Sequence, residues 1–107
     1  MSTNVLASTK EELEQLISQE KVVIADFFAT WCGPCRMLAP IIEQLNQEIG
    51  DKVKIVKIDV DQEKDLAMKY EIQSVPTVII FKDGEVHARE TGLQSIKTYK
   101  EIINKIL

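Results

Sequence analysis

The chain has 107 residues, of which 45% are hydrophobic and 28% charged, the composition of one globular domain spanning residues 1–107. Its 17 acidic and 13 basic side chains give a net charge of −4, which excludes nucleic acid as an expected partner, because nucleic-acid binding depends on cationic contacts to phosphate. No apolar run approaches the roughly 20 residues that cross a bilayer, and the first residues do not have the pattern of a secretory signal. We therefore expect a monomer in the cytoplasm, with no membrane association.

The first helix is predicted from a capping pattern. A short strand is allowed near Val5, before this helix. Ser8 with Glu11, or Thr9 with Glu12, matches the Ser/Thr-x-x-Glu capping box that begins many helices. The apolar residues that follow have helical spacing.

A buried strand and a long helix come next. Residues 21–29 are apolar at both odd and even positions around Asp26, which is typical of a strand covered on both faces. Apolar residues at helical spacing from 38 to 49 predict a helix. Pro40 should kink that helix, and Gly50 should end it.

The second half of the chain predicts three more strands and two more helices. Asp83-Gly84 is a strong hairpin signal, and Ser95 is a candidate cap for the last helix. The strands are expected over residues 53–59, 76–81 and 85–91, and the helices over 61–70 and 96–106. Alternation of strands and helices predicts a three-layer α/β/α fold, whose mixed central sheet has a parallel core and an antiparallel C-terminal hairpin.

The candidate site is the pair Cys32 and Cys35, which lies between the buried strand and the long helix. Pro34 suits the first turn of a helix, which places Cys32 just before the helix, near its unpaired N–H groups and its positive dipole end. Both features favour the thiolate, the nucleophile of disulfide exchange. Cys35 follows one turn later, within reach of a disulfide. The spacing therefore predicts that Cys32 attacks a substrate disulfide and Cys35 resolves the mixed disulfide.

The cysteine pair has two other possible interpretations. A zinc site usually needs four ligands, and the chain offers two cysteines and one histidine, His87. A purely structural disulfide across so short a loop would constrain the chain little, and the cytosol would reduce it. We expect no metal and no cofactor, and we interpret His87 as an exposed residue without function.

Residues 26–35, Asp-Phe-Phe-Ala-Thr-Trp-Cys-Gly-Pro-Cys, resemble the active-site segment of the thioredoxin family. The resemblance continues in Lys57, in Val75-Pro76-Thr77, in the hairpin at 81–84 and in Gly92, so it covers nearly the whole chain. It implies the thioredoxin-like fold and a protein-disulfide reductase that carries electrons to disulfide-containing substrate proteins. It also implies that a thioredoxin reductase recharges the protein.

The resemblance further implies a docking surface beside the disulfide. The proline matching Pro76 is cis in the family and packs against the disulfide. Position 28 is Phe where many relatives have Trp, and Thr91 and Leu93 flank the family glycine where relatives often have other residues. We expect these departures to affect packing and substrate preference rather than the reaction. The docking residues carried over are Trp31, Gly33, Pro34, Val75, Pro76 and Gly92.

Asp26 and Lys57 are the candidate ionisable residues of the site. The apolar neighbours of Asp26 leave no wet face, so we expect a buried acid with a raised pKa that passes a proton to or from Cys35. On pattern alone Lys57 could be an ordinary solvated lysine, whereas the resemblance places it beside Asp26, where its charge would tune the acid. Trp31 could be a core residue, but its place next to a reactive loop favours a role in shielding the thiolate and meeting substrate.

Two other functions remain open from the sequence. An oxidase or isomerase could use the same fold, although Gly-Pro between the cysteines and the missing export signal argue against it. A redox-independent binding module could use the same apolar surface to hold a partner protein. The direction of electron flow depends on the reduction potential of the cysteine pair.

Overall fold

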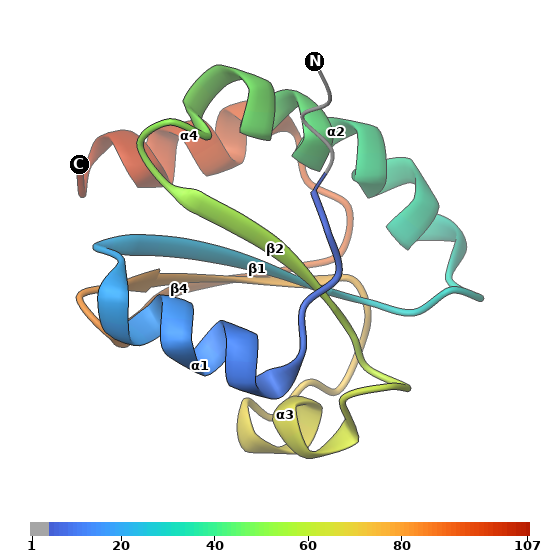
Figure 1. Ribbon diagram of the computed structural model, residues 1–107. Helices are drawn as coiled ribbons and strands as arrows, with labels where there is room; N and C mark the ends of the chain where they lie inside the picture. The colour runs from blue at the N-terminus through green and yellow to red at the C-terminus, as the bar shows by residue number, and fades with distance from the viewer. Residues whose placement is uncertain (1–4) are drawn as a thin grey trace.

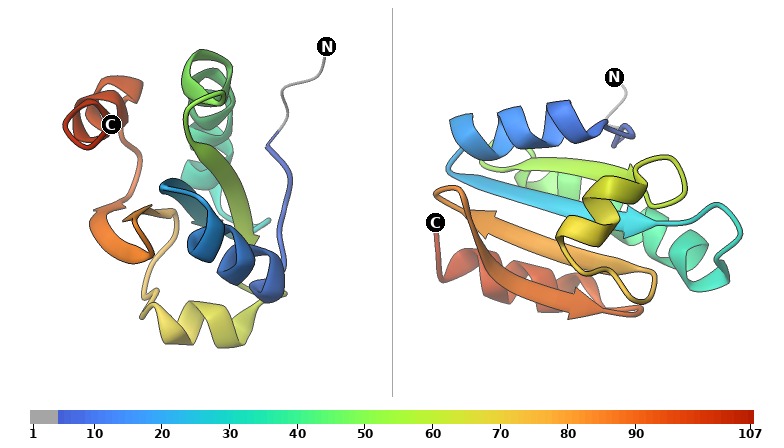
Figure 2. Two further views of the ribbon diagram at one scale, coloured as in Figure 1. Left: turned by 60° about the vertical axis from the view of Figure 1, so that its left-hand side comes forward. Right: turned by 90° about the horizontal axis from the view of Figure 1, so that it is seen from below.

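The computed structural model describes residues 5–107, which form a four-stranded sheet between two pairs of helices (Figure 1). Helices α2 and α4 cover one face of the sheet, and α1 and α3 lie on the other (Figures 1 and 2). The elements in chain order are α1 (Lys10–Gln19), β1 (Val22–Phe28), α2 (Gly33–Ile49), β2 (Lys54–Asp59), α3 (Lys64–Lys69), β3 (Thr77–Lys82), β4 (Glu85–Thr91) and α4 (Ile96–Asn104).

Helix α1 begins with the second of the two capping boxes that the sequence allows. The Glu12 backbone N–H donates to Thr9 Oγ1 at 3.2 Å, and the Thr9 N–H donates to Glu12 Oε1 at 2.8 Å. Since the helix starts at Lys10, little chain is left for a strand before it. Within the described residues, the short strand allowed near Val5 is reduced to a single parallel bridge between Ala7 and Lys57.

The sheet is mixed, as predicted, but its parallel part is smaller than predicted. The strand order is β2-β1-β3-β4, with β1 and β2 parallel and the other two pairs antiparallel. Helix α3 has only six residues, about 9 Å of helix, whereas six residues of strand extend about 20 Å. The connection over residues 60–76 starts and ends at the same edge of the sheet, since Asp59 pairs with Phe28 and Thr77 pairs with Phe27, and β3 consequently runs antiparallel to β1.

The predicted helix over 61–70 was wrong at its start, because the chain after β2 first forms turns. The carboxylate of Asp59 accepts the backbone N–H groups of Asp61 and Gln62 at 2.9 and 3.4 Å. These local bonds compete with helix formation, so α3 begins at Lys64. The predicted cap of α4 was also wrong in detail. Ser95 occupies the cap position, but its hydroxyl makes no bond to the helix backbone.

The hairpin between β3 and β4 is confirmed. Asp83 and Gly84 both have positive φ angles, 51° and 87°, as a tight two-residue hairpin turn requires. The register shifts after Ile80, which pairs with Ala88. His87 is the extra residue of this bulge and is exposed, as expected.

Helix α2 runs past Pro40 and ends at Ile49, as predicted. The C-cap, Gly50, has an ordinary right-handed backbone with φ −62°. A Cβ atom at this position would collide with Asn46, so the close approach of the backbone explains the glycine. The kink at Pro40 stays a prediction.

Side-chain alternation along β1 assigns its residues to two cores. Ile24 packs with residues of α2 and α4, and Ala25 packs with residues of α1 and α3. Asp26 has the parity of Ile24, so its carboxyl group enters the layer between the sheet and the α2/α4 pair. The strand therefore carries a carboxylic acid into an otherwise apolar core.

Candidate functional site

Cys32 and Cys35 form a disulfide at the N-terminus of α2, with their Cα atoms 5.2 Å apart. Cys32 is the N-cap residue, and the Cys35 backbone N–H donates to Cys32 Sγ at 3.2 Å. Pro34 lies in the first turn, where the lack of an N–H group costs no helical bond. A thiolate at Cys32 would thus receive a hydrogen bond and the field of the helix dipole.

The disulfide lies in a small apolar cluster at this end of the sheet. Cys32 is 4% exposed and Cys35 6%, so exposure does not distinguish the two sulfurs in the oxidised form. Cys32 Sγ is 3.6 Å from the carbonyl oxygen of Val75. The cluster joins Ala29, Cys32 and Cys35 with the partly buried side chains of Phe28, Val60 and Val75.

The segments after α3 and β4 meet beside the disulfide. The Val75–Pro76 peptide bond is cis, as the resemblance implies. Gly92 donates its N–H to the Pro76 carbonyl at 2.8 Å and has a φ of 84°, the left-handed conformation that favours glycine. Next to it, Leu93 is exposed. This bond ties the chain after β4 to the cis-proline loop next to Cys32.

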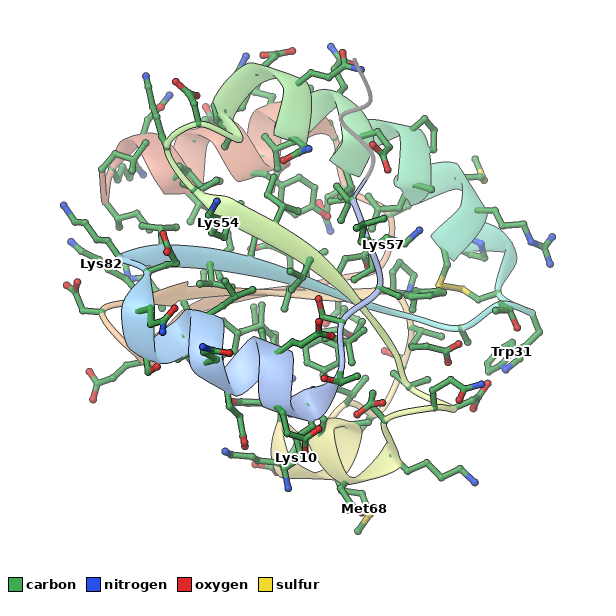
Figure 3. The ribbon with its side chains drawn as sticks, viewed as in Figure 1. Lys10, Trp31, Lys54, Lys57, Met68 and Lys82 are labelled. Atoms are coloured by element: carbon green, nitrogen blue, oxygen red, sulfur yellow. A yellow bond between two sulfur atoms is a disulfide. The ribbon has the colours of Figure 1, made fainter. Side chains whose placement is uncertain are left out.

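Trp31 lies at the outer edge of the site (Figure 3). Its side chain is 67% exposed, so the core interpretation of this residue was wrong. The indole Nε1–H donates to Asp61 Oδ2 at 2.9 Å, a contact that the sequence did not indicate. Trp31 and Val75 both line a cavity of about 160 Å³. Trp31 and Val75, which are far apart in sequence, therefore share one partly apolar surface.

Asp26 is the buried acid that the sequence predicted. It is 2% exposed, and burial raises its pKa to about 6, although the positive charge of Lys57 partly offsets this effect. Asp26 Oδ1 has no hydrogen-bond partner. Asp26 and Cys35 line one cavity of about 220 Å³, with Arg36 and Lys57 also at its wall. Asp26 and Cys35 therefore face the same cavity, as a proton exchange between them would require.

Lys57 lies directly across from Asp26 on the neighbouring strand, since the two are register partners of β1 and β2. Its ammonium nitrogen is 5.0 Å from the ring centroid of Phe28, and Figure 3 shows the side chain on β2. The ring provides a cation–π contact that holds the charge at the cavity. The aromatic residue at position 28, which is Phe in this chain, therefore has a contact that the sequence did not predict.

Two other kinds of feature are absent from residues 5–107. Within residues 5–107, no group of three or more His, Cys, Asp or Glu side chains is placed to hold a metal ion. No helix in the same range is long and apolar enough to cross a membrane.

Comparison with known proteins gives one consistent result. The family model described as Thioredoxin matches residues 4–106. The chain is 51% identical over 90 residues to a thioredoxin of Bacillus subtilis, covering 84% of this chain and 86% of that protein. It is 44% identical over 96 residues to a thioredoxin of Mycoplasmoides gallisepticum, covering 90% and 95% of the two chains. Among solved structures, a mutant thioredoxin from Halobacterium salinarum superposes with a TM-score of 0.88 at 38% identity, covering 96% of this chain and 89% of that chain.

Proposed function

The chain belongs to the thioredoxin family and is a thiol–disulfide oxidoreductase, and from this premise we propose that Cys32 and Cys35 divide the reaction into attack and resolution. The observation that carries the proposal is the disulfide at the N-terminus of α2, in which the Cys35 N–H donates to Cys32 Sγ. The family acts on disulfide-containing substrates and is served by a reductase. We propose a thioredoxin reductase as the partner of this chain and the cytoplasm as its place of action, where thiols are kept reduced.

In the proposed cycle, the reduced protein meets a substrate disulfide. The Cys32 thiolate attacks one substrate sulfur, which forms a mixed disulfide and releases the other substrate sulfur as a thiolate. Cys35 loses its proton and attacks Cys32 Sγ, which forms the intramolecular disulfide and releases the second substrate thiol. Two electrons have then passed to the substrate, and a reductase returns two electrons to the pair.

Asp26 is proposed as the proton acceptor for Cys35, and Lys57 as the charge that tunes it. Support comes from the shared cavity and from a pKa of about 6, which lets the acid change protonation state near neutral pH. The substrate is proposed to dock across both sides of the disulfide. The docking residues are Trp31, Gly33, Pro34, Val75, Pro76 and Gly92.

The test is a matched pair of cysteine variants. Cys35→Ser should accumulate covalent adducts with substrate proteins, because the first attack proceeds and the resolving attack is missing. Cys32→Ser should form few adducts and lose nearly all activity. Mass spectrometry of non-reduced samples measures both. Adducts that accumulate only in Cys32→Ser would reverse the assignment of the two sulfurs.

A redox-independent binding role is separated by the double variant Cys32→Ser, Cys35→Ser. If reduction of substrate disulfides is the function, this variant loses it entirely. A variant that still performs the cellular function would instead support a binding module. The reduction potential of the wild-type pair against glutathione decides the direction, and a value near those of strong oxidants would contradict a reductase.

A further inference from the structure

Two buried polar atoms of the described residues have no hydrogen-bond partner, and they lie in the same layer of the molecule. They are Asp26 Oδ1 and the hydroxyl oxygen of Tyr99. Asp26 is 2% exposed and Tyr99 is completely buried. Because nearly all buried polar side chains in folded proteins are paired, two unpaired atoms in one layer call for a common explanation.

Tyr99 of α4 packs on the face of the sheet that Asp26 enters from β1. Strand pairing places Lys57, Asp26, Val78 and Glu90 in one row across the four strands, with the same side-chain parity. Tyr99 packs in the same core cluster as Val78, the residue between the two acids of this row. The acids are about 10 Å apart along the row, at about 4.8 Å per strand, a span that one tyrosine side chain can overlie.

Electrostatics link the hydroxyl to both acids. Burial raises the pKa of Tyr99 above its usual range, and the charges of Asp26 and Glu90 raise it further. The group therefore stays protonated wherever the protein is folded, so it is always able to donate a hydrogen bond. An ionised Asp26 has an acceptor oxygen without a donor.

We propose that Tyr99 is a positioning residue for Asp26. When Asp26 loses its proton, the Tyr99 hydroxyl moves towards Asp26 Oδ1 and donates a hydrogen bond to it. Lys57 favours the carboxylate from β2, and Tyr99 favours it from α4. In the structure the two oxygens are not hydrogen-bonded, so the contact requires a small shift of the Tyr99 side chain towards Asp26, and it is absent while the acid is protonated. The contact does not depend on the proposed function, whereas its effect on the reaction rests on the proposed role of Asp26.

Other groups that face Asp26 do not replace this donor. Glu90 of β4 lies one strand beyond Val78 in the row, and its carboxylate can only accept hydrogen bonds. Cys35 of α2, in the disulfide, carries no charge. Arg36 lines the cavity, but its Nη2 donates to the Thr30 carbonyl at 3.4 Å. Tyr99 is therefore the neutral donor that approaches from the α4 side.

The first test is the titration of Asp26 in the oxidised protein, followed by NMR of ¹³C-labelled aspartate carboxyl groups. Tyr99→Phe should raise the Asp26 midpoint by about 0.5–1 unit, since one hydrogen bond to the charged form is lost. The matched control is Tyr70→Phe, whose ring packs with Phe27 and Phe81 on the opposite face of the sheet. It should leave the midpoint unchanged. An unchanged or lowered midpoint in Tyr99→Phe, or an equal rise in the control, would overturn the proposal.

The second test separates this proposal from the proposed function. The pH dependence of the unfolding free energy should change with Tyr99→Phe in the wild-type protein and not in an Asp26→Asn background. An equal change in both backgrounds would mean that the hydroxyl acts independently of Asp26. For activity, the Asp26-dependent limb of the pH–rate profile should move by the same amount as the NMR midpoint. If Asp26 has no catalytic role, the NMR midpoint still moves while the pH–rate profile does not.

Discussion

Replacing Asp26 by Ala tests the buried acid through the stability of the fold. The pKa of Asp26 is about 6 in the folded protein, against 3.8 for an aspartate exposed to water. Between these two values the folded state holds a proton that the unfolded chain has lost. The free energy of unfolding must therefore fall as the pH rises from about 4 to about 6, and it stays lowered above that range.

The magnitude follows from the shift of about 2 units. At about 1.36 kcal/mol per unit, ionising Asp26 in the core costs the folded state about 3 kcal/mol near neutral pH. About half of this loss is present at pH 5 and nearly all of it at pH 8. Alanine removes the loss but leaves a small cavity. We expect Asp26→Ala to be more stable than the wild type at pH 8 by about 1–2 kcal/mol. The difference in unfolding free energy between the two proteins should grow by about 1–2 kcal/mol from pH 5 to pH 8.

Urea denaturation of the oxidised proteins at both pH values measures this advantage. Asp51→Ala is the matched control, because Asp51 is exposed and should show a small effect that does not change with pH. The decisive quantity is the difference between the two pH values, since the cavity contributes equally to both. An advantage that is equal at pH 5 and pH 8 would refute the reasoning, because it would show that Asp26 does not titrate in this range in the folded state.

Two further substitutions test neighbouring features of the site. Lys57→Met should raise the pKa of Asp26 by about 1 unit, since Lys57 favours the carboxylate. Carboxyl NMR measures this shift, and Lys54→Met, an exposed lysine of the same strand, should leave it unchanged. Gly92→Ala should destabilise the protein by about 1–2 kcal/mol, because its φ is 84° while no atom lies near the added Cβ. Gly33→Ala, equally open but in the first turn of α2, should cause no loss in urea melts, and equal losses in both would contradict the conformational explanation.

The sequence alone determined most of the helices and strands and the position of the cysteine pair. The apolar residues of β1 and α2 show the periodicity of their elements, and Asp83-Gly84 has the turn chemistry of a hairpin. The burial of Asp26 was also predictable, because its neighbours along β1 are apolar on both faces. These features depend on residues close together in the chain, so their pattern can be read locally.

Only the tertiary structure decided which distant groups meet. The direction of β3 depends on the path of residues 60–76, which start and end at the same edge of the sheet, and the start of α3 depends on the hydrogen bonds that Asp59 makes. The spacing of α4 predicts that Tyr99 is buried, but it does not show that its hydroxyl shares a layer with Asp26. Such a meeting depends on strand register and helix placement between residues far apart in sequence, and local periodicity carries no information about either.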